Sequence, residues 1–460
     1  MRYTRSMLYG PDGSRLWSGE ANASQYALDY VPSGPVKQVL AGLLPSAKTP
    51  QSKSCTRGDV IKATEKMEYV TRDGCPKGFV HLLPRCVRLN ERVMAYNWDH
   101  LAAFRPAVVQ PSNIFDLSDP ETQELTKSFE ESGQMFGLAA PDDRLRLGYA
   151  TDPMLFKWLR GKMLKDARLP YAVFTRLPGF RRIHSGSIGG LDRLRQYEIP
   201  DLHVLCRPED ALDLILTHFE EAAKVARAWF GDEFAHFIDV VHDMGSSAIH
   251  AFATRAARAM NQFTLVNILG EQPRYYSFRS GLMVDGGYGN VMLHNTQWDQ
   301  ENGRRFRILT EDGTPVSIIH ATVAGGAHKL LPLFVGRGIG GLGSRNIPLE
   351  LAPVQVLVLP VSAEHRPRAE AFADELSQSG IPAALLAAPQ SLSKRMNLCR
   401  KHWDPCIAVI GEKEIRSGKV SIESTAKAWR YPTEEFVAAF GARIRQGHRE
   451  TRSFRFDLPY

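Results

Sequence analysis

The 460-residue chain lacks several features that define common protein classes. It has no apolar run near the roughly 18 residues that a membrane span requires, and its first residues form no apolar signal core. We therefore expect a cytoplasmic protein with no membrane partner. The six cysteines are scattered and form no C-x-x-C pair, which fits reduced thiols and argues against a zinc ribbon. No internal repeat or long low-complexity tract is present.

The composition is typical of an ordinary globular protein with two or three domains. Hydrophobic residues make up 43% and charged residues 23% of the chain, which is enough to build several cores. The net charge is +7 and the sequence pI is about 9.0. This basic excess permits a polyanionic partner, but many proteins that bind no polyanion share it. The indications of function therefore come from motifs.

One stretch, residues 179–206, combines strand-forming residues with arginine, aspartate and histidine. An apolar run at 171–174 leads into it, a loop rich in glycine and serine follows at 184–190, and a second run covers 191–206. Two strands joined by a long polar loop with arginines at both ends suit a polyanion such as a nucleoside triphosphate. An ordinary hairpin with a solvated basic loop has the same spacing, so the spacing alone leaves both interpretations open.

The amino-acid sequence of this stretch resembles a known motif. It reads S-G-S-I-G-G-L-D-R-L-R and then P-D-L-H, followed by a cysteine. This is similar to motif 2 of the class II aminoacyl-tRNA synthetases, most closely those of the archaeal-type threonyl-tRNA synthetase family. A P-K-G turn at 76–78 and the V-Q-P segment at 109–111 resemble the surroundings of motif 1, with its helix expected at 79–101 although Pro84 interrupts the first turns. Because motif 1 packs at a dimer interface in class II enzymes, the resemblance implies a homodimer.

The resemblance also implies a nucleotide site for ATP with Mg²⁺. Arg181 holds the motif 2 arginine position that neutralises the α-phosphate, and Arg193 holds the second nucleotide-binding arginine. Lys329 stands where motif 3 has an arginine, and lysine keeps the charge but not the planar fork. Gln297 is expected to contact both nucleotide and substrate. Ile183 replaces the glutamate that reads adenine in the family. Arg181 and Lys329 are the expected catalytic residues.

A metal site is the second implication of the resemblance. The family selects threonine with zinc held by one cysteine and two histidines, and the matching positions here are Asp152, His203 and His320. Asp201 matches the residue that accepts a hydrogen bond from the substrate hydroxyl, and His203 is also expected to face the substrate. Two histidines and a carboxylate form a sensible zinc triad, and they also suit Fe(II) or Mn(II). The alternative is that the histidines are ordinary core residues and Asp152 caps a helix.

Residues from 349 on show a different pattern, in which strand and helix segments alternate. This order predicts a parallel sheet with helices on both faces. The wording L-A-P-V-Q-V and later G-E-K-E closely resembles the anticodon-binding domain of the same family. Basic residues here could contact tRNA phosphates, although a charge run is usually a solvated face. They are Lys394, Arg395, Arg400, Lys401 and Lys413.

The predicted fold class is therefore mixed α/β. An α+β catalytic domain with a class II antiparallel sheet flanked by helices is expected at residues 57–345, followed by a small parallel-sheet α/β anticodon-binding domain at 346–460. Residues 1–56, rich in serine, proline and glycine, predict an irregular lead with one helix at 35–44 and no assigned function. The chain shows no resemblance to the family's editing domain.

Three functions remain open at this stage. The first is activation of an amino acid with ATP, with threonine expected, and its transfer to tRNA(Thr). The second is a biosynthetic paralogue that passes the activated amino acid to an amine, a hydroxylamine or a carrier protein, which the replacements at Asp152, Ile183 and Lys329 favour. Met292 also favours it, because the bacterial branch of the family has glutamine there. The third is a regulator that binds RNA without catalysis.

Overall fold

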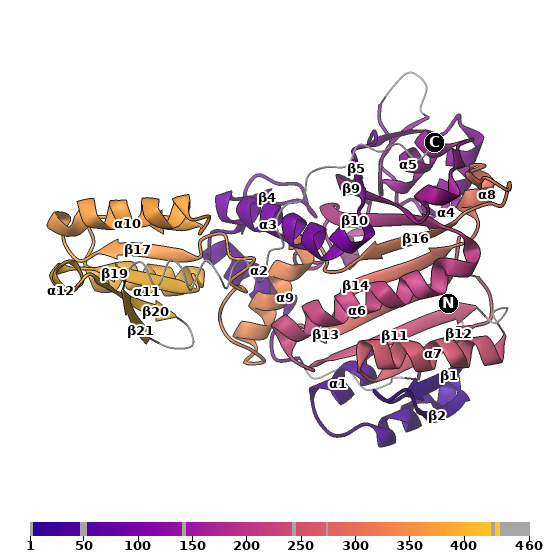
Figure 1. The fold of residues 1–460 in the computed structure, drawn as a ribbon, viewed down its shortest axis with the longest axis horizontal. Coiled ribbons are helices and arrows are strands. Elements are labelled where there is room, and N and C mark those ends of the chain that lie inside the picture. Colours follow the sequence, from indigo (N-terminus) through magenta and orange to yellow (C-terminus); the bar gives the residue numbers. More distant parts are fainter. Residues whose placement is uncertain are drawn as a thin grey trace.

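The computed structural model describes residues 3–46, 53–139, 144–241, 245–272, 275–424 and 428–432, and a ten-stranded sheet forms its centre (Figure 1). The strand order is β2-β1-β12-β11-β13-β14-β16-β10-β9-β5. Most neighbours run antiparallel, and the β11–β12 and β5–β9 pairs are parallel. The strands are β1 (Tyr3–Tyr9), β2 (Arg15–Glu20), β5 (Ala107–Val109), β9 (Tyr171–Phe180), β10 (Gln196–Cys206), β11 (Phe234–Val241), β12 (Thr264–Leu269), β13 (Tyr276–Asp285), β14 (Asn290–Asp299) and β16 (Ser317–Thr322).

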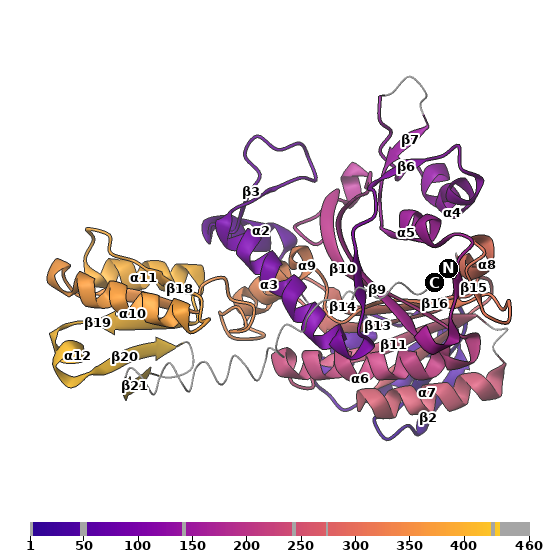
Figure 2. The same cartoon turned by 45° about the horizontal axis from the view of Figure 1, so that its top comes forward.

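Two long helices cover one face of this sheet. α6 (Ala211–Phe230) and α7 (Ser246–Met260) lie side by side across it in both views (Figures 1 and 2). α6 carries Asp213 in its first turn and Arg227 in its last, which matches the helix dipole. Its apolar stripe, including fully buried Ile215, joins the largest hydrophobic core. The amphipathic patterns at 208–230 and 244–262 predict these two helices, and the structure confirms both.

The opposite face of the sheet holds the candidate site. Over β9 and β10 this face is covered by α5 (Asp152–Leu159), whose Leu155 and Phe156 are fully buried. Over β11 and β13 it is covered by α1 (Pro35–Ala41), which confirms the helix predicted near residue 35. On this face, the sheet side chains between α5 and α1 are polar, whereas those under each helix belong to apolar cores.

Three further helices carry or flank the regions that resemble motifs 1 and 3. They are α2 (Arg57–Lys66), α3 (Pro84–Leu101) and α9 (Ala327–Ile339). α3 begins at Pro84, so the start predicted at residue 79 is wrong. Proline lacks a backbone N–H and its fixed φ suits the first position of a helix, which explains the boundary. β5 follows α3 in the chain and forms the edge of the main sheet next to β9.

Residues 3–20 form two strands of the main sheet, so the prediction of an irregular lead is wrong for this part. β1 pairs antiparallel with β12, and β2 pairs with β1. Met7, Leu8 and Tyr9 are buried on both faces of the sheet. A short strand buried on both faces shows no alternation of polar and apolar residues, which is why the sequence did not reveal it. The domain boundaries stay predictions.

The C-terminal region forms a separate five-stranded sheet in the order β18-β17-β19-β20-β21. The first three strands are parallel, as predicted, and β20 and β21 extend the sheet in antiparallel fashion, which was not predicted. Residues 433–460 of the predicted domain lie outside the described residues. The elements are β17 (Val356–Pro360), α10 (Arg366–Gln378), β18 (Ala383–Leu385), α11 (Leu392–His402), β19 (Cys406–Ile410), α12 (Glu412–Ser417), β20 (Lys419–Ser424) and β21 (Ala428–Pro432).

Arg395 is not available for a phosphate contact. It is 4% exposed, and its guanidinium donates hydrogen bonds to the backbone carbonyls of Gln390, Leu386 and Val361. The buried guanidinium thus joins three backbone segments at this end of the sheet. The prediction that Arg395 contacts tRNA is therefore wrong.

The two sheets are joined by a buried ion pair. Arg85 on α3 contacts Asp404 at the end of α11, with Nη1 2.6 Å from Oδ1 and Nη2 3.3 Å from Oδ2. The Asp404 side chain is 2% exposed. Next to it, Trp403 joins the core of the larger domain and packs closely on Gly338 of α9. The C-terminal domain is thus fixed to the helices of motifs 1 and 3.

The remaining strands and helices lie outside the two large sheets and their covering helices. They are β3 (Val70–Thr71), β4 (His81–Leu82), β6 (Ile114–Asp116), α4 (Pro120–Glu131), β7 (Leu145–Leu147), β8 (Met163–Leu164), α8 (Asn302–Arg305) and β15 (Leu309–Thr310).

No helix among the described residues is long and apolar enough to cross a membrane.

Candidate active site

Four polar side chains form a row across the open face of the main sheet. His203 on β10 lies opposite His320 on β16, His320 lies opposite Gln297 on β14, and Gln297 lies opposite Arg279 on β13. Residues directly opposite one another project from the same face of a sheet. Strand pairing therefore places the two predicted histidine ligands and the predicted substrate residue Gln297 side by side.

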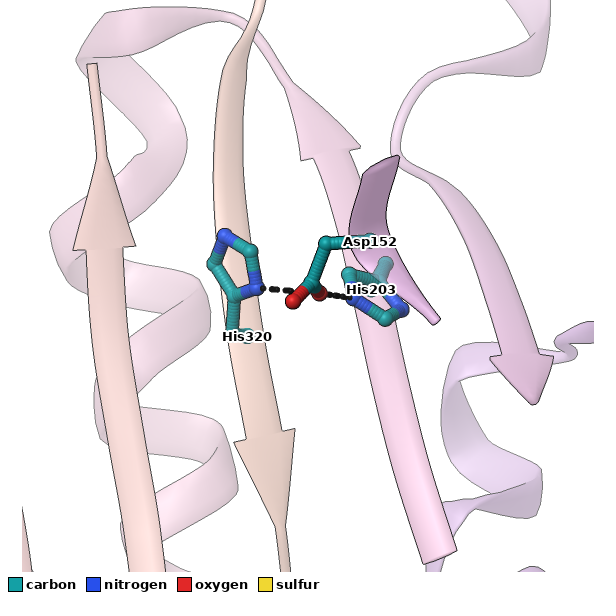
Figure 3. A group of neighbouring side chains, drawn as sticks. All are labelled: Asp152, His203 and His320. Atoms are coloured by element: carbon teal, nitrogen blue, oxygen red, sulfur yellow. Dashed lines mark hydrogen bonds and ion pairs between the residues drawn. The ribbon is translucent and has the colours of Figure 1, made fainter. Parts of the chain in front are cut away.

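Asp152, the third predicted ligand, reaches this row from the start of α5 (Figure 3). Its Oδ1 lies 2.5 Å from His203 Nε2 and 3.2 Å from His320 Nδ1. All three side chains are buried. The N-cap residue of α5 is Thr151, whose side chain makes no capping hydrogen bond. The interpretation of Asp152 as a helix cap is therefore wrong, because its carboxylate faces the histidines.

Hydrogen bonds oppose the effect of burial on the pKa of Asp152 and of His320. Burial alone would raise the pKa of Asp152, but the bonds from His203 and His320 hold it well below its usual range. Burial alone would lower the pKa of His320, whereas its bonds to Asp152 and Asp299 raise it. Asp299 is fully buried, with Oδ2 3.2 Å from His320 Nε2. Asp201 Oδ2 lies 3.8 Å from His203 Nε2, and burial raises the pKa of Asp201.

The cluster fits a divalent metal. The possible ligand atoms of Asp152, His203 and His320 lie within 4.8 Å of one another. Two imidazole nitrogens and one carboxylate oxygen suit zinc with an open position, and they also suit Fe(II) or Mn(II). Asp299 holds the far nitrogen of His320, as carboxylates do for metal-bound histidines. The far nitrogen of His203, Nδ1, is buried and has no hydrogen-bond partner among the described residues.

Arg181 follows directly on β9 and is enclosed by aromatic rings. Its guanidinium carbon lies 5.3, 5.8 and 5.5 Å from the ring centres of Phe129, Tyr149 and Tyr197. Phe129 and Tyr149 stack with centroids 3.8 Å apart. No carboxylate in the described residues pairs with Arg181, so the rings hold the guanidinium without neutralising it.

Lys329 and Arg279 add positive charge near Arg181. Burial, together with the charges of Arg181 and Arg279, lowers the pKa of Lys329 to about 8, and Asp192 acts in the opposite direction. The charge of Arg181 also acts on Asp201, so the cations adjoin the histidine cluster. Neither Lys329 nor Arg279 has an ion-pair partner in the part of the chain that the structure describes. Three cations without partners on one face suit a polyanion.

The two other predicted residues differ in their surroundings. Gln297 accepts a hydrogen bond from Tyr275 Oη at 3.1 Å, and Tyr275 packs on His320. Arg193 is exposed in the turn before β10, and no contact joins it to the row in this structure. Its role in nucleotide binding stays a prediction. The backbone carbonyl of Ile183 accepts hydrogen bonds from Arg195, and its backbone N–H donates to the Arg181 carbonyl.

Several residues of the site were not predicted from the sequence. Arg279, Asp299 and Tyr275 join it through strand register and packing, and Phe129 and Tyr149 join it from α4 and the segment before α5. Asp299 belongs to a T-x-Q-x-D wording typical of the family, so a signal for it was present. The others stand among ordinary strand and helix residues, and the sequence contains no signal for their proximity.

The fold is that of a class II synthetase-like domain, and the comparisons agree. Residues 355–442 match the family model of the anticodon binding domain. A threonyl-tRNA synthetase of Aeropyrum pernix has a TM-score of 0.69 at 18% identity and covers 85% of this chain and 96% of its own. The RNA binding domain of threonyl-tRNA synthetase from Cryptosporidium parvum also has a TM-score of 0.69 at 18% identity, covering 83% and 98%. The predicted fold class is confirmed.

Curated relatives lead to a more specific statement. The chain is 26% identical over 366 residues to the threonine–tRNA ligase of Staphylothermus marinus, covering 75% of this chain and 57% of the relative. It is 24% identical to that of Methanoculleus marisnigri, covering 90% and 66%. The chain thus spans about three fifths of the length of these relatives. It is threonyl-tRNA synthetase-like in sequence and fold, which confirms the predicted resemblance.

Proposed function

We propose that this chain activates threonine with ATP and transfers it to tRNA(Thr). The strongest support is that a cluster of possible metal ligands and a cationic residue lie close together at one face of the sheet. Asp152, His203 and His320 form a compact cluster beside Asp201, and the charge of Arg181 acts on Asp201. An amino-acid site thus adjoins a site for phosphates, as adenylate formation requires. The names of the curated relatives support the choice of threonine.

In the proposed first step, a carboxylate oxygen of threonine attacks the α-phosphorus of ATP. The bond to the bridging oxygen breaks, and pyrophosphate leaves with the electron pair. Both reactants are anions, so the site must offset their repulsion. Arg181, Lys329 and Arg279 supply three cations, and Mg²⁺ on the phosphates is the expected cofactor. Because Arg181 is held by rings and not by a carboxylate, its N–H groups stay free for a phosphate.

Threonine and valine are nearly isosteric, so the site must read the hydroxyl. Asp201, with 23% of its side chain exposed, can accept a hydrogen bond from that hydroxyl. A zinc ion held by Asp152, His203 and His320 would act as a Lewis acid that binds the amino and hydroxyl groups of threonine. Valine has no hydroxyl, so it would leave Asp201 without this hydrogen bond and the zinc without this ligand. In a buried site, such unpaired polar groups reduce the binding free energy.

The match to an anticodon-binding domain supports tRNA as the acceptor and partner. On α11 and α12, Lys394 and Lys413 are exposed and available to phosphates, whereas Arg400 pairs with Glu423. A homodimer through α3 and β5 is part of the proposal. Val87 on α3 and Val108 on β5 are 43% and 48% exposed, and a dimer would cover them.

The second candidate function is transfer of the activated amino acid to an amine, a hydroxylamine or a carrier protein. Three positions favour it. Ile183 offers no side-chain acceptor for the adenine amino group, Lys329 cannot form the planar fork of an arginine, and Asp152 replaces a cysteine ligand. These replacements change how nucleotide and amino acid are held, and they do not identify the acceptor.

Two assays test these functions in order. Exchange of pyrophosphate into ATP over a panel of amino acids is expected to depend on threonine. Absence of exchange with every amino acid would leave only the RNA-binding alternative. Charging of tRNA(Thr) is then expected. Threonine adenylate formed without charging would contradict tRNA as the acceptor and favour the second candidate.

A further inference from the structure

The polar row of the site continues beyond Arg279 to the N-terminal strand. Arg279 on β13 lies opposite Asp239 on β11, Asp239 lies opposite Asn267 on β12, and Asn267 lies opposite Ser6 on β1. With the four residues named above, the row crosses seven neighbouring strands of the main sheet, from β10 to β1. The sequence assigned no function to β1, yet this strand ends the row.

Hydrogen bonds connect the far half of the row. Ser6 Oγ donates to Asn267 Oδ1 at 2.8 Å, and Asn267 Nδ2 donates to Asp239 Oδ1 at 3.1 Å. Tyr3 Oη donates to Asp239 Oδ2 at 3.4 Å. Ser6, Asn267 and Asp239 are at most 3% exposed. Both oxygens of the Asp239 carboxylate are therefore fixed by groups on β1 and β12.

A β-bulge brings Tyr3 to this face of the sheet. Tyr3 pairs with Leu269 and Arg5 pairs with Ile268, so Thr4 is an extra residue in β1. Without the extra residue, the alternation of side chains would turn Tyr3 to the face covered by α7. Bulges that redirect a side chain in this way are frequent beside active sites. The bulge therefore allows Tyr3 Oη to reach the Asp239 carboxylate.

Asp239 is the carboxylate that acts on Arg279. The Arg279 guanidinium lies over the Phe237 ring at 5.5 Å, and its Nη2 lies 3.8 Å from Met292 Sδ. No carboxylate of the described residues lies within ion-pair distance of it, but Asp239 is directly opposite in register and their charges interact. A fixed anion opposite the guanidinium attracts it without forming an ion pair, so N–H groups other than the one near Met292 Sδ are left for a ligand.

We propose that β1 is a positioning element of the nucleotide site. Tyr3, Ser6 and Asn267 fix the Asp239 carboxylate, and Asp239 orients Arg279 toward the phosphates of ATP. The inference rests on the proposed function, because it assumes that Arg279 meets a nucleotide. Asp239 is buried and touches no substrate, so it acts through Arg279. A purely structural network that only attaches β1 to the sheet is the competing explanation.

The test compares Asp239→Asn, Tyr3→Phe and the control Thr4→Val in the full chain. Thr4→Val removes a hydroxyl from an exposed residue of the same strand, one that donates to the Ile268 carbonyl and not to Asp239. The measurements are ATP affinity by calorimetry, kcat and KM for ATP in pyrophosphate exchange, and Tm. We expect Asp239→Asn to weaken ATP binding about tenfold, at the lower end of the factor of about 10 to 100 that supporting residues contribute. Tyr3→Phe removes one of the hydrogen bonds to Asp239 and should weaken ATP binding about threefold. The KM for threonine, and the ATP affinity of Thr4→Val, should not change.

A double-mutant cycle with Arg279→Gln separates positioning from structure. If Asp239 acts through Arg279, Asp239→Asn has no further effect on ATP affinity once Arg279 is replaced. The same loss in both backgrounds, or a loss that follows Tm, would overturn the proposal. If Asp239→Asn does not fold, Tyr3→Phe completes the same cycle. Calorimetry needs no turnover, so a chain that binds ATP without exchange would disprove the proposed function and still test this one.

Discussion

Asp152 Oδ1 lies 2.5 Å from His203 Nε2, at the position where relatives of this type are expected to carry a cysteine ligand. The same oxygen is 3.2 Å from His320 Nδ1, so one carboxylate oxygen joins two imidazoles from different strands. Either shared protons or a bound metal ion can hold these three side chains together. Substitution of one of them changes the metal content of the protein only in the second case. The site therefore allows a direct chemical test.

Asp152→Cys is expected to tighten zinc binding by roughly tenfold, because thiolate is a softer ligand that zinc prefers. His203→Ala is expected to abolish binding, since only two ligands would remain. Metal analysis of the purified protein and competition with a chelator measure both effects. His81→Ala serves as the control, because His81 is exposed on β4. Equal metal content in His203→Ala and the unchanged chain would contradict the triad.

Lys329 gives the reaction a pH dependence. Burial and the nearby arginines lower the pKa of Lys329 to about 8, so its charge is lost at higher pH. The value of kcat/KM for ATP reports the free enzyme and should fall about tenfold between pH 7 and pH 9. Lys329→Arg should flatten this profile, because a guanidinium stays charged. A matched Lys413→Arg variant on α12 should keep the decline, and an equal decline in Lys329→Arg would exclude Lys329 as its source.

Glu221 on α6 contributes stability that acid removes. His100 Nδ1 lies 3.2 Å from its Oε2 and Lys224 Nζ lies 2.7 Å from its Oε1, and the His100 contact lowers the pKa of Glu221 to about 2. A lowered carboxyl pKa stabilises the fold above the unfolded value near 4.5, and the contribution is lost as the pH falls toward 2.

We therefore expect Glu221→Gln to reduce the free energy of unfolding by about 1 kcal/mol at pH 6 and to have little effect near pH 2.5. Urea unfolding at several pH values measures this. Glu220→Gln changes an exposed neighbour in the same helix and should have no such effect. A destabilisation of Glu221→Gln that is independent of pH would show that packing, and not charge, is responsible.

The ion pair between Arg85 and Asp404 connects the two sheets. Arg85→Ala would leave a carboxylate that is 2% exposed without its partner, so we expect a loss of about 3 kcal/mol in stability. Threonine-dependent exchange should persist because the Arg85–Asp404 ion pair includes no residue of the candidate site, while tRNA charging should fall. Thermal unfolding and the two activity assays measure these effects. Arg88→Ala, on the exposed side of α3, is the control, and equal losses of exchange and charging would contradict the expected separation.

Local sequence patterns predicted most helices and the order of the motifs. α6 was visible from its apolar stripe and its charge gradient, because these arise from periodicity and the helix dipole. α3 begins five residues later than the pattern at 79–101 predicts, because Pro84 occupies the first position of the helix. β1 and β2 were missed, because strands buried on both faces or on a sheet edge show no clear alternation.

Motifs shared with a family of enzymes are enough to identify His203, His320, Asp152 and Arg181 as candidate site residues. The T-x-Q-x-D segment already indicated Asp299, whereas the proximity of Arg279 and Asp239 is visible only in the folded structure. Their positions depend on the register between strands far apart in the chain, and on a bulge that shifts this register by one residue. Register follows from packing the whole sheet against its helices, so no local pattern specifies it.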